Sequence, residues 1–353
     1  MRVGTYFFLQ APPDRTATWV LTDEVEQMVL SEQLGFDSVW LTEHHYADYG
    51  ISSAPSVLLA TVAARTQRIT LGMAVYVLPF HHPLRLAEET ATLDILSNGR
   101  LVVGLGRGNR ALEFLGHGVP QDESRTRMEE GVEVLRRAWT EDRVTFQGQY
   151  WQLDGIPVFP KPRTQPHPPL AFAVSSTESL EWAGAHGFPI MSSGLFTPLA
   201  ATLTQRATYL AALQQAGHSE QAISDLLAQW VVTKHVYVAP TDAQARAEAK
   251  DAELWFLDAY ARSVDPAGLR GISDSVRAAA EATAARTRAL TWDALVDDCL
   301  LIGSPVTVRQ KALELREAGV GELVCWMNFG GLDPERARRS MRLFADEVLP
   351  ALR

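Results

Sequence analysis

A carboxylate and two adjacent imidazoles, Glu43, His44 and His45, directly follow a short apolar run at residues 38–41. The run is typical of a buried parallel strand, which needs no such polar residues for its packing. Histidine at neutral pH can serve as a base, a hydrogen-bond donor or a metal ligand. Two adjacent histidines rarely chelate one ion, and no HxH or HExxH spacing lies nearby, so we expect no metal. A hydrogen-bonded structural pair is the alternative to a catalytic one.

A second group of residues is suited to holding a phosphate. Residues 104–108 read Gly-Leu-Gly-Arg-Gly, and their glycines let backbone amides approach a ligand beside the cation of Arg107. Arg125 precedes a helical pattern, and residues 174–179 place hydroxyls and N–H groups at the start of another helix, where phosphate is favoured. Taken singly, these features also fit a tight barrel turn and ordinary helix caps. Together they predict a phosphate cradle.

Aromatic and polar residues near the ends of other expected strands and helices predict an apolar pocket for a flat substrate. Trp326 and Asn328 end the last expected strand, and Trp255 lies near the end of a helix that precedes a loop-like region. Core positions are the alternative for the aromatic residues. The residues that we assign to the substrate pocket are Tyr6, Asn109, Ser192, Trp255, Trp326 and Asn328.

These residues need a scaffold that brings several strand ends together. Short apolar runs alternate with helical patterns along the chain, which predicts a parallel sheet. The eight expected strands are residues 3–9, 38–41, 69–77, 101–105, 170–174, 189–193, 230–238 and 322–327. We therefore predict an α/β fold, a (β/α)8 TIM barrel, with its site at the carboxyl ends of the strands.

Two regions interrupt this alternation, and we interpret both as insertions in a single domain spanning residues 1–353. The first, at about 141–169, is rich in Gln, Gly, Pro and aromatic residues and contains an expected hairpin at 145–151. The second, at about 261–298, begins with loop-like sequence and continues as an Ala-rich helical stretch. The first helix of the barrel is expected to open at Thr22, where a Thr-Asp-Glu sequence resembles a helix start.

The composition restricts the class of protein. Hydrophobic residues make up 46% of the chain, charged residues 21%, and the formal net charge is −10, which argues against a nucleic-acid-binding surface. No apolar run approaches the roughly 18 residues of a membrane helix, and the amino terminus lacks the pattern of a signal peptide. Cys299 and Cys325 form no metal-binding pair or disulfide framework. We expect a soluble cytoplasmic protein without nucleic-acid or membrane partners.

Over nearly its whole length the chain resembles the bacterial luciferase-like family of flavin-dependent monooxygenases. The resemblance implies a TIM-type barrel that binds reduced FMN (FMNH2) at its carboxyl-terminal mouth, usually as a homodimer. The stretches that carry it are residues 35–45, Leu78-Pro79 with His82-Pro83, residues 97–101, the turn at 104–108, Ser176 with residues 181–183, and residues 303–305.

The resemblance also assigns roles to individual residues. His44 matches the catalytic histidine of the light-emitting enzyme's active subunit and would be the general acid/base, with Glu43 or His45 setting its tautomer. Ala74 and Val75 would lie against the isoalloxazine ring, often through a non-proline cis peptide. The residues implied to hold the FMN phosphate are Arg107, Arg125, Ser176 and Ser179.

Three departures from the family pattern limit what the resemblance implies. Gly106 stands where that luciferase has a reactive cysteine near the flavin, which leaves more room and no thiol. Ser175 replaces an acidic residue beside the phosphate site. The second insertion resembles the family's mobile lid but is Ala-rich and lacks lysine. Oxidation of a long-chain aldehyde with light emission is therefore not assigned.

The resemblance favours an FMNH2- and O2-dependent monooxygenase of a two-component system, supplied by a separate NAD(P)H:flavin reductase. It would oxidise an apolar or aromatic small molecule through a C4a-peroxyflavin, by hydroxylation, epoxidation or Baeyer–Villiger insertion. One alternative is an F420-dependent dehydrogenase or reductase of the same superfamily. The other is a flavin-binding protein without turnover.

Overall fold

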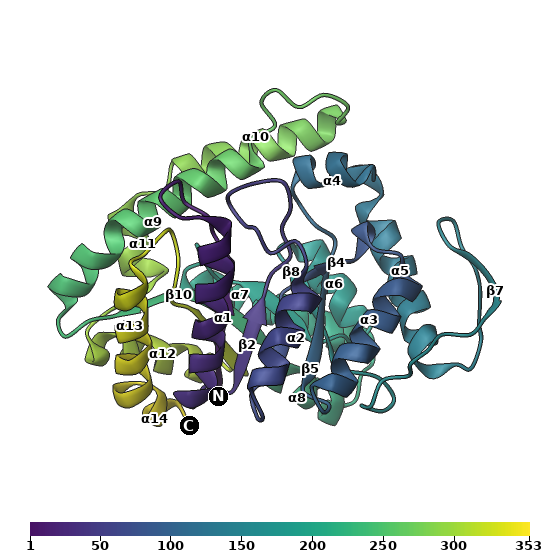
Figure 1. Ribbon diagram of the computed structural model, residues 1–353, viewed down its shortest axis with the longest axis horizontal. Coiled ribbons are helices and arrows are strands. Elements are labelled where there is room, and N and C mark those ends of the chain that lie inside the picture. The colour runs from purple at the N-terminus through teal and green to yellow at the C-terminus, as the bar shows by residue number, and fades with distance from the viewer.

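The computed structural model describes residues 1–353, and its centre is a closed barrel of eight parallel strands (Figure 1). Each strand pairs with the next along the chain, and the last pairs with the first. The predicted TIM barrel is confirmed. The barrel strands are β1 (Arg2–Phe7), β2 (Ser38–Leu41), β3 (Thr70–Met73), β5 (Leu101–Gly106), β8 (Leu170–Val174), β9 (Ile190–Ser193), β10 (Val231–Val238) and β12 (Glu322–Trp326).

All eight predicted strands are present, and two of them differ in extent. The first ends at Phe7, and the third divides at Ala74–Val75 into β3 and the short β4 (Tyr76–Val77), which pairs with β5. A further strand, β11 (Leu301–Gly303), was not predicted and extends the sheet beside the end of β10. At three residues it is too short to show a hydrophobic period.

Helices surround the barrel on all sides, and most lie where the apolar periodicity placed them. The helices α4, α8, α11, α12 and α14 were not predicted. The helices are α1 (Ala17–Gln33), α2 (Pro55–Arg65), α3 (Pro83–Leu96), α4 (Ala111–His117), α5 (Ser124–Thr140), α6 (Thr177–Ala185), α7 (Leu199–Gln215), α8 (Glu220–Ala228), α9 (Asp242–Val264), α10 (Asp274–Arg288), α11 (Trp292–Asp298), α12 (Pro305–Glu317), α13 (Pro334–Glu347) and α14 (Leu349–Leu352), with short 3-10 turns η1 (Leu78–Phe80) and η2 (Gln121–Glu123).

The expected start of the first helix at Thr22 was wrong. Thr16 caps α1 instead, because its hydroxyl accepts a hydrogen bond from the backbone N–H of Trp19. Thr22 lies inside the helix, where its hydroxyl donates to the carbonyl of Thr18 one turn earlier. The Thr-Asp-Glu pattern therefore occurs within a helix that an earlier threonine had already begun.

The two interrupting regions lie at different places on the barrel. The first contains an antiparallel pair, β6 (Val144–Gln147) and β7 (Gln152–Ile156), which projects to the right in Figure 1. In the second, α10 packs along α9, and the two helices run across the top of the view (Figure 1). The end of α9 lies beside the segment that follows β2, because both line one cavity. This second region therefore lies over the carboxyl ends of the strands.

Alternate residues of the strands pack into two different hydrophobic clusters. Phe7 belongs to a cluster of 58 buried residues between the strands and the surrounding helices. Tyr6 and Phe8 belong to a second cluster of 27 residues, which includes Trp326 and the inner faces of α9 and α11. The barrel mouth is therefore supported from below by aromatic side chains. None of the helices is both long and apolar enough to cross a membrane.

Candidate active site

A cavity of about 240 Å³ opens at the carboxyl ends of the barrel strands. Segments that follow β2, β3 and β5 contribute to it, as do the last residues of β1, β8 and β9. This is the position at which side chains from several strands of a TIM barrel can converge on one ligand. The predicted site residues that line the cavity are Tyr6, Glu43, His44, Ala74, Val75, Gly106, Arg107, Asn109, Arg125, Ser175 and Ser179.

His44 is held in place by a carboxylate that sequence reasoning did not identify. Its Nδ1 lies 2.8 Å from Oε1 of Glu113, and its ring lies 4.6 Å from the ring of Phe8. The same Glu113 oxygen accepts a hydrogen bond of 3.0 Å from the backbone N–H of His45. His44 Nε2 makes no hydrogen bond to the protein. A carboxylate on Nδ1 fixes the tautomer of an imidazole and leaves Nε2 free for proton transfer.

Glu113 stays ionised in this position. Burial acts to raise its pKa, but the charge of His44 and the hydrogen bonds from His44 and from the N–H of His45 lower it below the ordinary value. Glu113 therefore presents a full negative charge to the imidazole. This arrangement favours the tautomer of His44 with its proton on Nδ1.

Glu43 and His45 belong to a separate cluster, so the expectation that one of them sets the tautomer of His44 was wrong. His45 Nε2 lies 3.0 Å from Glu43 Oε1, and His81 Nε2 lies 2.8 Å from the same oxygen. The N–H of Val77 donates to Glu43 Oε2 at 2.7 Å. Successive residues after a strand point in different directions, so adjacent histidines reach different carboxylates. His81, which follows the short turn η1, is the third member of this cluster.

The surroundings of Glu43 strongly favour its ionised form. Burial acts to raise the pKa of Glu43, but hydrogen bonds from His45 and His81, the charge of His81 and the N–H of Val77 lower it to about 2. Burial acts to lower the pKa of His81, but its hydrogen bond to Glu43 and the Glu43 charge raise it. An ionised Glu43 therefore holds these groups together throughout the neutral range.

The expected phosphate cradle lies at another part of the same rim, where two arginines face the amino terminus of α6. Burial, and then the nearby charge of Arg125, lower the pKa of Arg107. Arg125 Nη2 lies 2.8 Å from Oε2 of Glu178, a residue whose side chain is 70% exposed. That nitrogen is buried and lacks the alignment of a hydrogen bond. Two cations beside a helix amino terminus fit a phosphate dianion.

Ser176 and Ser179 form the cap of α6, and the two contribute differently to the cavity. Ser179 Oγ accepts hydrogen bonds from the N–H groups of Ser175 and Ser176, at 3.1 and 3.0 Å. The backbone N–H of Ser179 donates to Ser176 Oγ, which completes a capping box. Ser175 and Ser179 line the cavity, whereas the Ser176 side chain does not. Ser176 orders the helix start that faces the phosphate position.

One wall of the cavity matches the resemblance closely. The peptide bond between Ala74 and Val75 is cis, as the resemblance implies. A Cβ on Gly106 would lie 2.6 Å from Val75 Cγ2, so no larger residue fits there without movement of Val75. The expectation that Gly106 leaves more room was therefore wrong. The side chain of Val75 takes the space that a longer residue at 106 would need.

Four of the six residues assigned to the substrate pocket do not line the cavity, and this corrects the expectation. Ser192 is buried and accepts a hydrogen bond of 3.0 Å from Trp230 Nε1. Trp326 is fully buried beneath Phe8, whose ring stacks on it at 4.7 Å. Asn328 is also buried, and Trp255 lines a different hollow between α9, the segment before α1 and the start of α13. The aromatic layer that supports the mouth hides the residues below it.

Two residues at the mouth, Arg110 and Tyr49, were missed in addition to Glu113. Arg110, Tyr49 and Tyr260 line the cavity beside His44. Arg110 immediately precedes α4, a helix of seven residues that is too short to give a clear apolar period. A charged residue next to the Gly104-to-Gly108 turn was the only signal for Arg110 in the sequence. Nothing local marked Tyr49.

Comparison with known proteins identifies the family. The luciferase-like monooxygenase family matches residues 1–322. An uncharacterised protein of Sinorhizobium fredii is 31% identical over 85% of this chain and 83% of its own length. The oxygenase component of a flavin-dependent trigonelline monooxygenase from Acinetobacter baylyi is 26% identical over 99% of this chain and 95% of its own length.

Solved structures agree with this result. A monooxygenase from Streptomyces bottropensis superimposes with a TM-score of 0.81 and 28% identity, over 99% of both chains. An F420-dependent secondary alcohol dehydrogenase superimposes with a TM-score of 0.76 and 18% identity, over 100% of this chain and 99% of the other. The second likeness concerns the fold alone. One barrel architecture thus occurs with two different cofactors.

Proposed function

The chain belongs to the luciferase-like monooxygenase family, and on that premise we propose that it is a flavin-dependent monooxygenase that uses FMNH2 and O2. One oxygen atom enters an apolar or aromatic substrate by hydroxylation, epoxidation or Baeyer–Villiger insertion. The other leaves as water while FMNH2 is oxidised to FMN. The observation that carries the proposal is a single cavity lined by both the arginine pair and the His44–Glu113 pair.

The chain's own residues divide the work in this proposal. Bound reduced flavin supplies the reaction with O2. Arg107 and Arg125 hold the phosphate, and Val75 lies against the ring system. His44 transfers the proton at Nε2, and Glu113 positions it. The apolar walls of the mouth exclude water from the reacting groups.

A separate reductase is part of the proposal. The printed name of the Acinetobacter baylyi relative describes it as an oxygenase component, which supports a two-component system here as well. An NAD(P)H:flavin reductase in the cytoplasm would supply FMNH2 to this chain. Product formation is measured with the two proteins mixed and with the two separated by a dialysis membrane that FMNH2 can cross. Equal product formation in both arrangements would show that docking of the reductase is not needed.

The central experiment mixes the protein and FMNH2 with labelled O2 in the presence of candidate substrates. We expect one labelled oxygen atom in the product and a dependence of product formation on FMNH2. Arg125→Met is expected to weaken FMN binding about 10- to 100-fold, because it removes a charge-assisted contact to the phosphate. Tight binding of F420 together with weak binding of FMN would instead favour a hydride-transferring dehydrogenase. Binding of FMN without any oxygen incorporation would favour a non-catalytic flavin protein.

We propose that the second interrupting region acts as a lid over the mouth. Only Ala284 and Thr287 of α10 are buried, so the helix is weakly anchored. Gly268 and Gly271, in the segment before it, have positive φ angles that suit a hinge. Hydrogen exchange over residues 265–290 is expected to slow when FMN and substrate are bound. Unchanged exchange would exclude closure of this segment.

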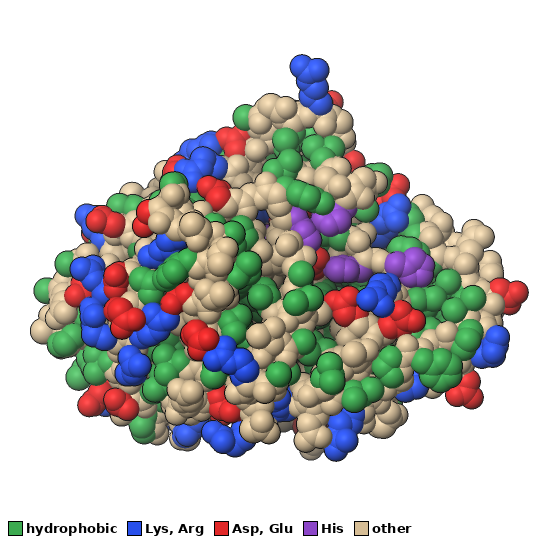
Figure 2. Space-filling model, in the orientation of Figure 1, with side chains coloured by type: hydrophobic (Ala, Val, Ile, Leu, Met, Phe, Trp, Pro, Cys, Tyr) green, Lys and Arg blue, Asp and Glu red, His purple; other side chains and the backbone are tan.

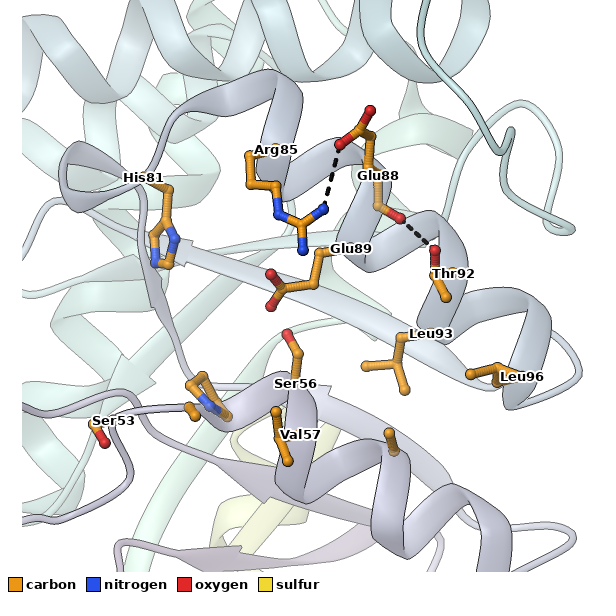
Figure 3. Close-up of a pocket in the computed structure, with 13 residues that line it drawn as sticks. Ser53, Ser56, Val57, His81, Arg85, Glu88, Glu89, Thr92, Leu93 and Leu96 are labelled. Atoms are coloured by element: carbon orange, nitrogen blue, oxygen red, sulfur yellow. Dashed lines mark hydrogen bonds and ion pairs between the residues drawn. The ribbon is translucent and has the colours of Figure 1, made fainter.

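We also propose that the chain forms a homodimer through the outer face of α2 and α3. A hollow of about 460 Å³ lies between these helices, with His81 at one end and Leu96 at the other (Figure 3). Val57 and Leu96 are 67% and 66% exposed, which is unusual for large apolar side chains at a concave surface. Arg85 and Glu88 pair at 3.4 Å across the same face. A symmetric copy would bury the apolar residues, and Arg85 of each copy could pair with Glu88 of the other.

Sedimentation of the wild type and of two variants tests the dimer. Val57→Asp is expected to give a monomer, because it places a charge in the proposed interface. Val306→Asp is the matched control, since Val306 is 65% exposed on α12 and lies outside the hollow. Dissociation of both variants, or of neither, would contradict this choice of interface.

A further inference from the structure

Arg110 is the only arginine among the buried residues, and the proposed oxygenation gives it no task. It lies in the wall between two cavities. One is the active-site cavity, and the other is an outer cavity of about 250 Å³ beneath the end of α9. His44, Tyr49, Arg110 and Glu113 line both cavities. Figure 2 shows histidine side chains gathered in a hollow on this face of the molecule.

The guanidinium of Arg110 has more donors than partners. Nη2 donates to the hydroxyl of Tyr49 at 3.1 Å, whereas Nε and Nη1 are buried and make no hydrogen bond. The guanidinium carbon lies 4.9 Å from the ring of Tyr49 and 4.5 Å from the ring of Tyr260. A buried cation with unused N–H groups is costly unless an anion completes its surroundings.

The protein itself does not provide that anion. Glu113 is the carboxylate whose charge acts on Arg110, but it already accepts hydrogen bonds from His44 and from the N–H of His45. No ion pair joins Glu113 to Arg110. The two aromatic rings stabilise the cation through their faces but offer no negative charge. The missing partner of Arg110 is therefore a group that a ligand brings.

We propose that Arg110 binds the carboxylate of the substrate, so that the enzyme acts on flat, aromatic carboxylic acids. This inference rests on the proposed monooxygenase function, because it names the substrate of the same site. An arginine offers two parallel N–H groups that match a carboxylate. The charge of Glu113 nearby favours a monoanion over a dianion such as phosphate. The rings of Tyr49 and Tyr260 provide flat apolar surface beside the anion.

The geometry also relates the anion to the reacting groups. Arg110 and His44 line the same two cavities, so a substrate held by its carboxylate at Arg110 extends past His44 Nε2. The outer cavity, lined by Ala259, Ser263 and Leu269, then provides the route by which the acid arrives. The phosphate cradle lies at another part of the rim and remains available to the flavin.

Titration of the flavin-free protein with matched acids and amides tests the proposal. The probes are benzoate and 2-naphthoate, with benzamide and 2-naphthamide as neutral counterparts of the same shape. We expect each acid to bind at least tenfold more tightly than its amide. Arg110→Met is expected to abolish this preference, and Arg110→Lys to retain part of it, because an ammonium keeps the charge but lacks the planar fork.

Two controls separate this result from unfolding and from binding in the phosphate cradle. Arg110→Met is expected to raise the melting temperature without ligand, because it removes an unpaired buried charge. If it does not fold, Arg110→Lys decides, and an unchanged preference for acids in that variant overturns the proposal. Arg125→Met is expected to keep the preference while losing FMN affinity.

Equal binding of acids and amides, or no binding of either, overturns the proposal. So does a preference that persists in Arg110→Met or that disappears in Arg125→Met, because the acid would then occupy the phosphate cradle. The titration needs neither flavin nor O2. A preference for acids together with absent oxygen incorporation would therefore reject the proposed function and leave the anion site in place.

Discussion

Two carboxylate–histidine clusters lie side by side at the mouth of the barrel, and they differ in what their carboxylates bind. Glu43 is 2% exposed and accepts hydrogen bonds from His45, His81 and the N–H of Val77. Glu113 holds Nδ1 of His44, and the other ring nitrogen makes no hydrogen bond to the protein. The consecutive histidines 44 and 45 thus belong to different clusters.

The difference shows how one short motif can serve both stability and chemistry. In the Glu43 cluster the carboxylate binds two histidines and a backbone N–H, so its interaction energy contributes to folding. In the Glu113 pair one nitrogen is left for a ligand, so part of its interaction energy is available only when a substrate is present. What each carboxylate binds, and whether its histidine lines the active-site cavity, separates the two roles. Four predictions test this distinction.

The largest expected effect concerns the pair of His44 and Glu113. His44→Ala is expected to lower kcat/KM for oxygen incorporation about 100- to 10,000-fold, because it removes the proton-transfer group. His45→Ala, the adjacent control, is expected to change it less than about tenfold and mainly to reduce stability. Both are measured with labelled O2 and a substrate identified for the wild type. Equal loss of activity in the two variants would remove the distinction between the clusters.

The Glu43 cluster is expected to contribute more to the free energy of unfolding than an exposed ion pair does. Glu43→Ala is expected to lower the free energy of unfolding by about 3–5 kcal/mol, because it leaves the partly buried His45 and His81 without their partner. Glu26→Ala is the matched control: Glu26 also binds its partner, Arg65, through two oxygens but is exposed, and a loss below about 1 kcal/mol is expected. Urea unfolding at pH 7 measures both. Similar losses would show that enclosure is unimportant.

The same cluster is expected to make stability depend on pH in two directions. The pKa of Glu43 falls from 4.5 to about 2 on folding, so its contribution, about 3 kcal/mol, is present above pH 4.5 and is lost as the pH falls toward 2. The pKa of His81 is raised from 6.5, so its contribution is present below pH 6.5 and is lost as the pH rises through the folded value. Glu43→Gln should flatten both limbs of the curve. An unchanged curve would contradict the coupling.

The smallest expected effect concerns the positioning of His44. Glu113→Gln is expected to lower kcat about 10- to 100-fold, because the tautomer and orientation of the imidazole are no longer held by a charge. KM should change little, since Glu113 does not bind the substrate. Glu113→Asp should recover part of the rate. A rise in KM with an unchanged kcat would show that Glu113 acts on substrate binding instead.

Much of the scaffold could be read from short windows of sequence. Each barrel strand is a compact apolar run, and the helices between them have an apolar face, so both kinds of element carry a local signal. The arginines and serines of the cradle follow strand ends or begin helices, and the fold places all such positions on one rim. This is why Arg107, Arg125, Ser175 and Ser179 were predicted to lie together, and the structure brings them to one cavity.

The substrate pocket could not be read in the same way. Trp326 ends a strand, as a pocket residue would, yet Phe8 stacks on its ring and separates it from the cavity. Whether an aromatic residue at a strand end lines a cavity or supports it depends on which ring lies above it. That order is decided by packing across the barrel, which depends on side chains from several strands and cannot be read from one of them.

The sequence by itself determined the barrel, the family and the rim on which His44 and the arginines lie, because these depend on local hydrophobic periods and strand ends. Only the tertiary structure decided what each of these groups does. His44 and Glu113 are separated by 69 positions, and α4 brings them within 2.8 Å. Arg110 is buried beside the rings of two tyrosines, and this packing leaves two of its nitrogens without a hydrogen-bond partner. Hydrogen-bond partners and desolvation arise from packing between distant segments, and no local pattern encodes them.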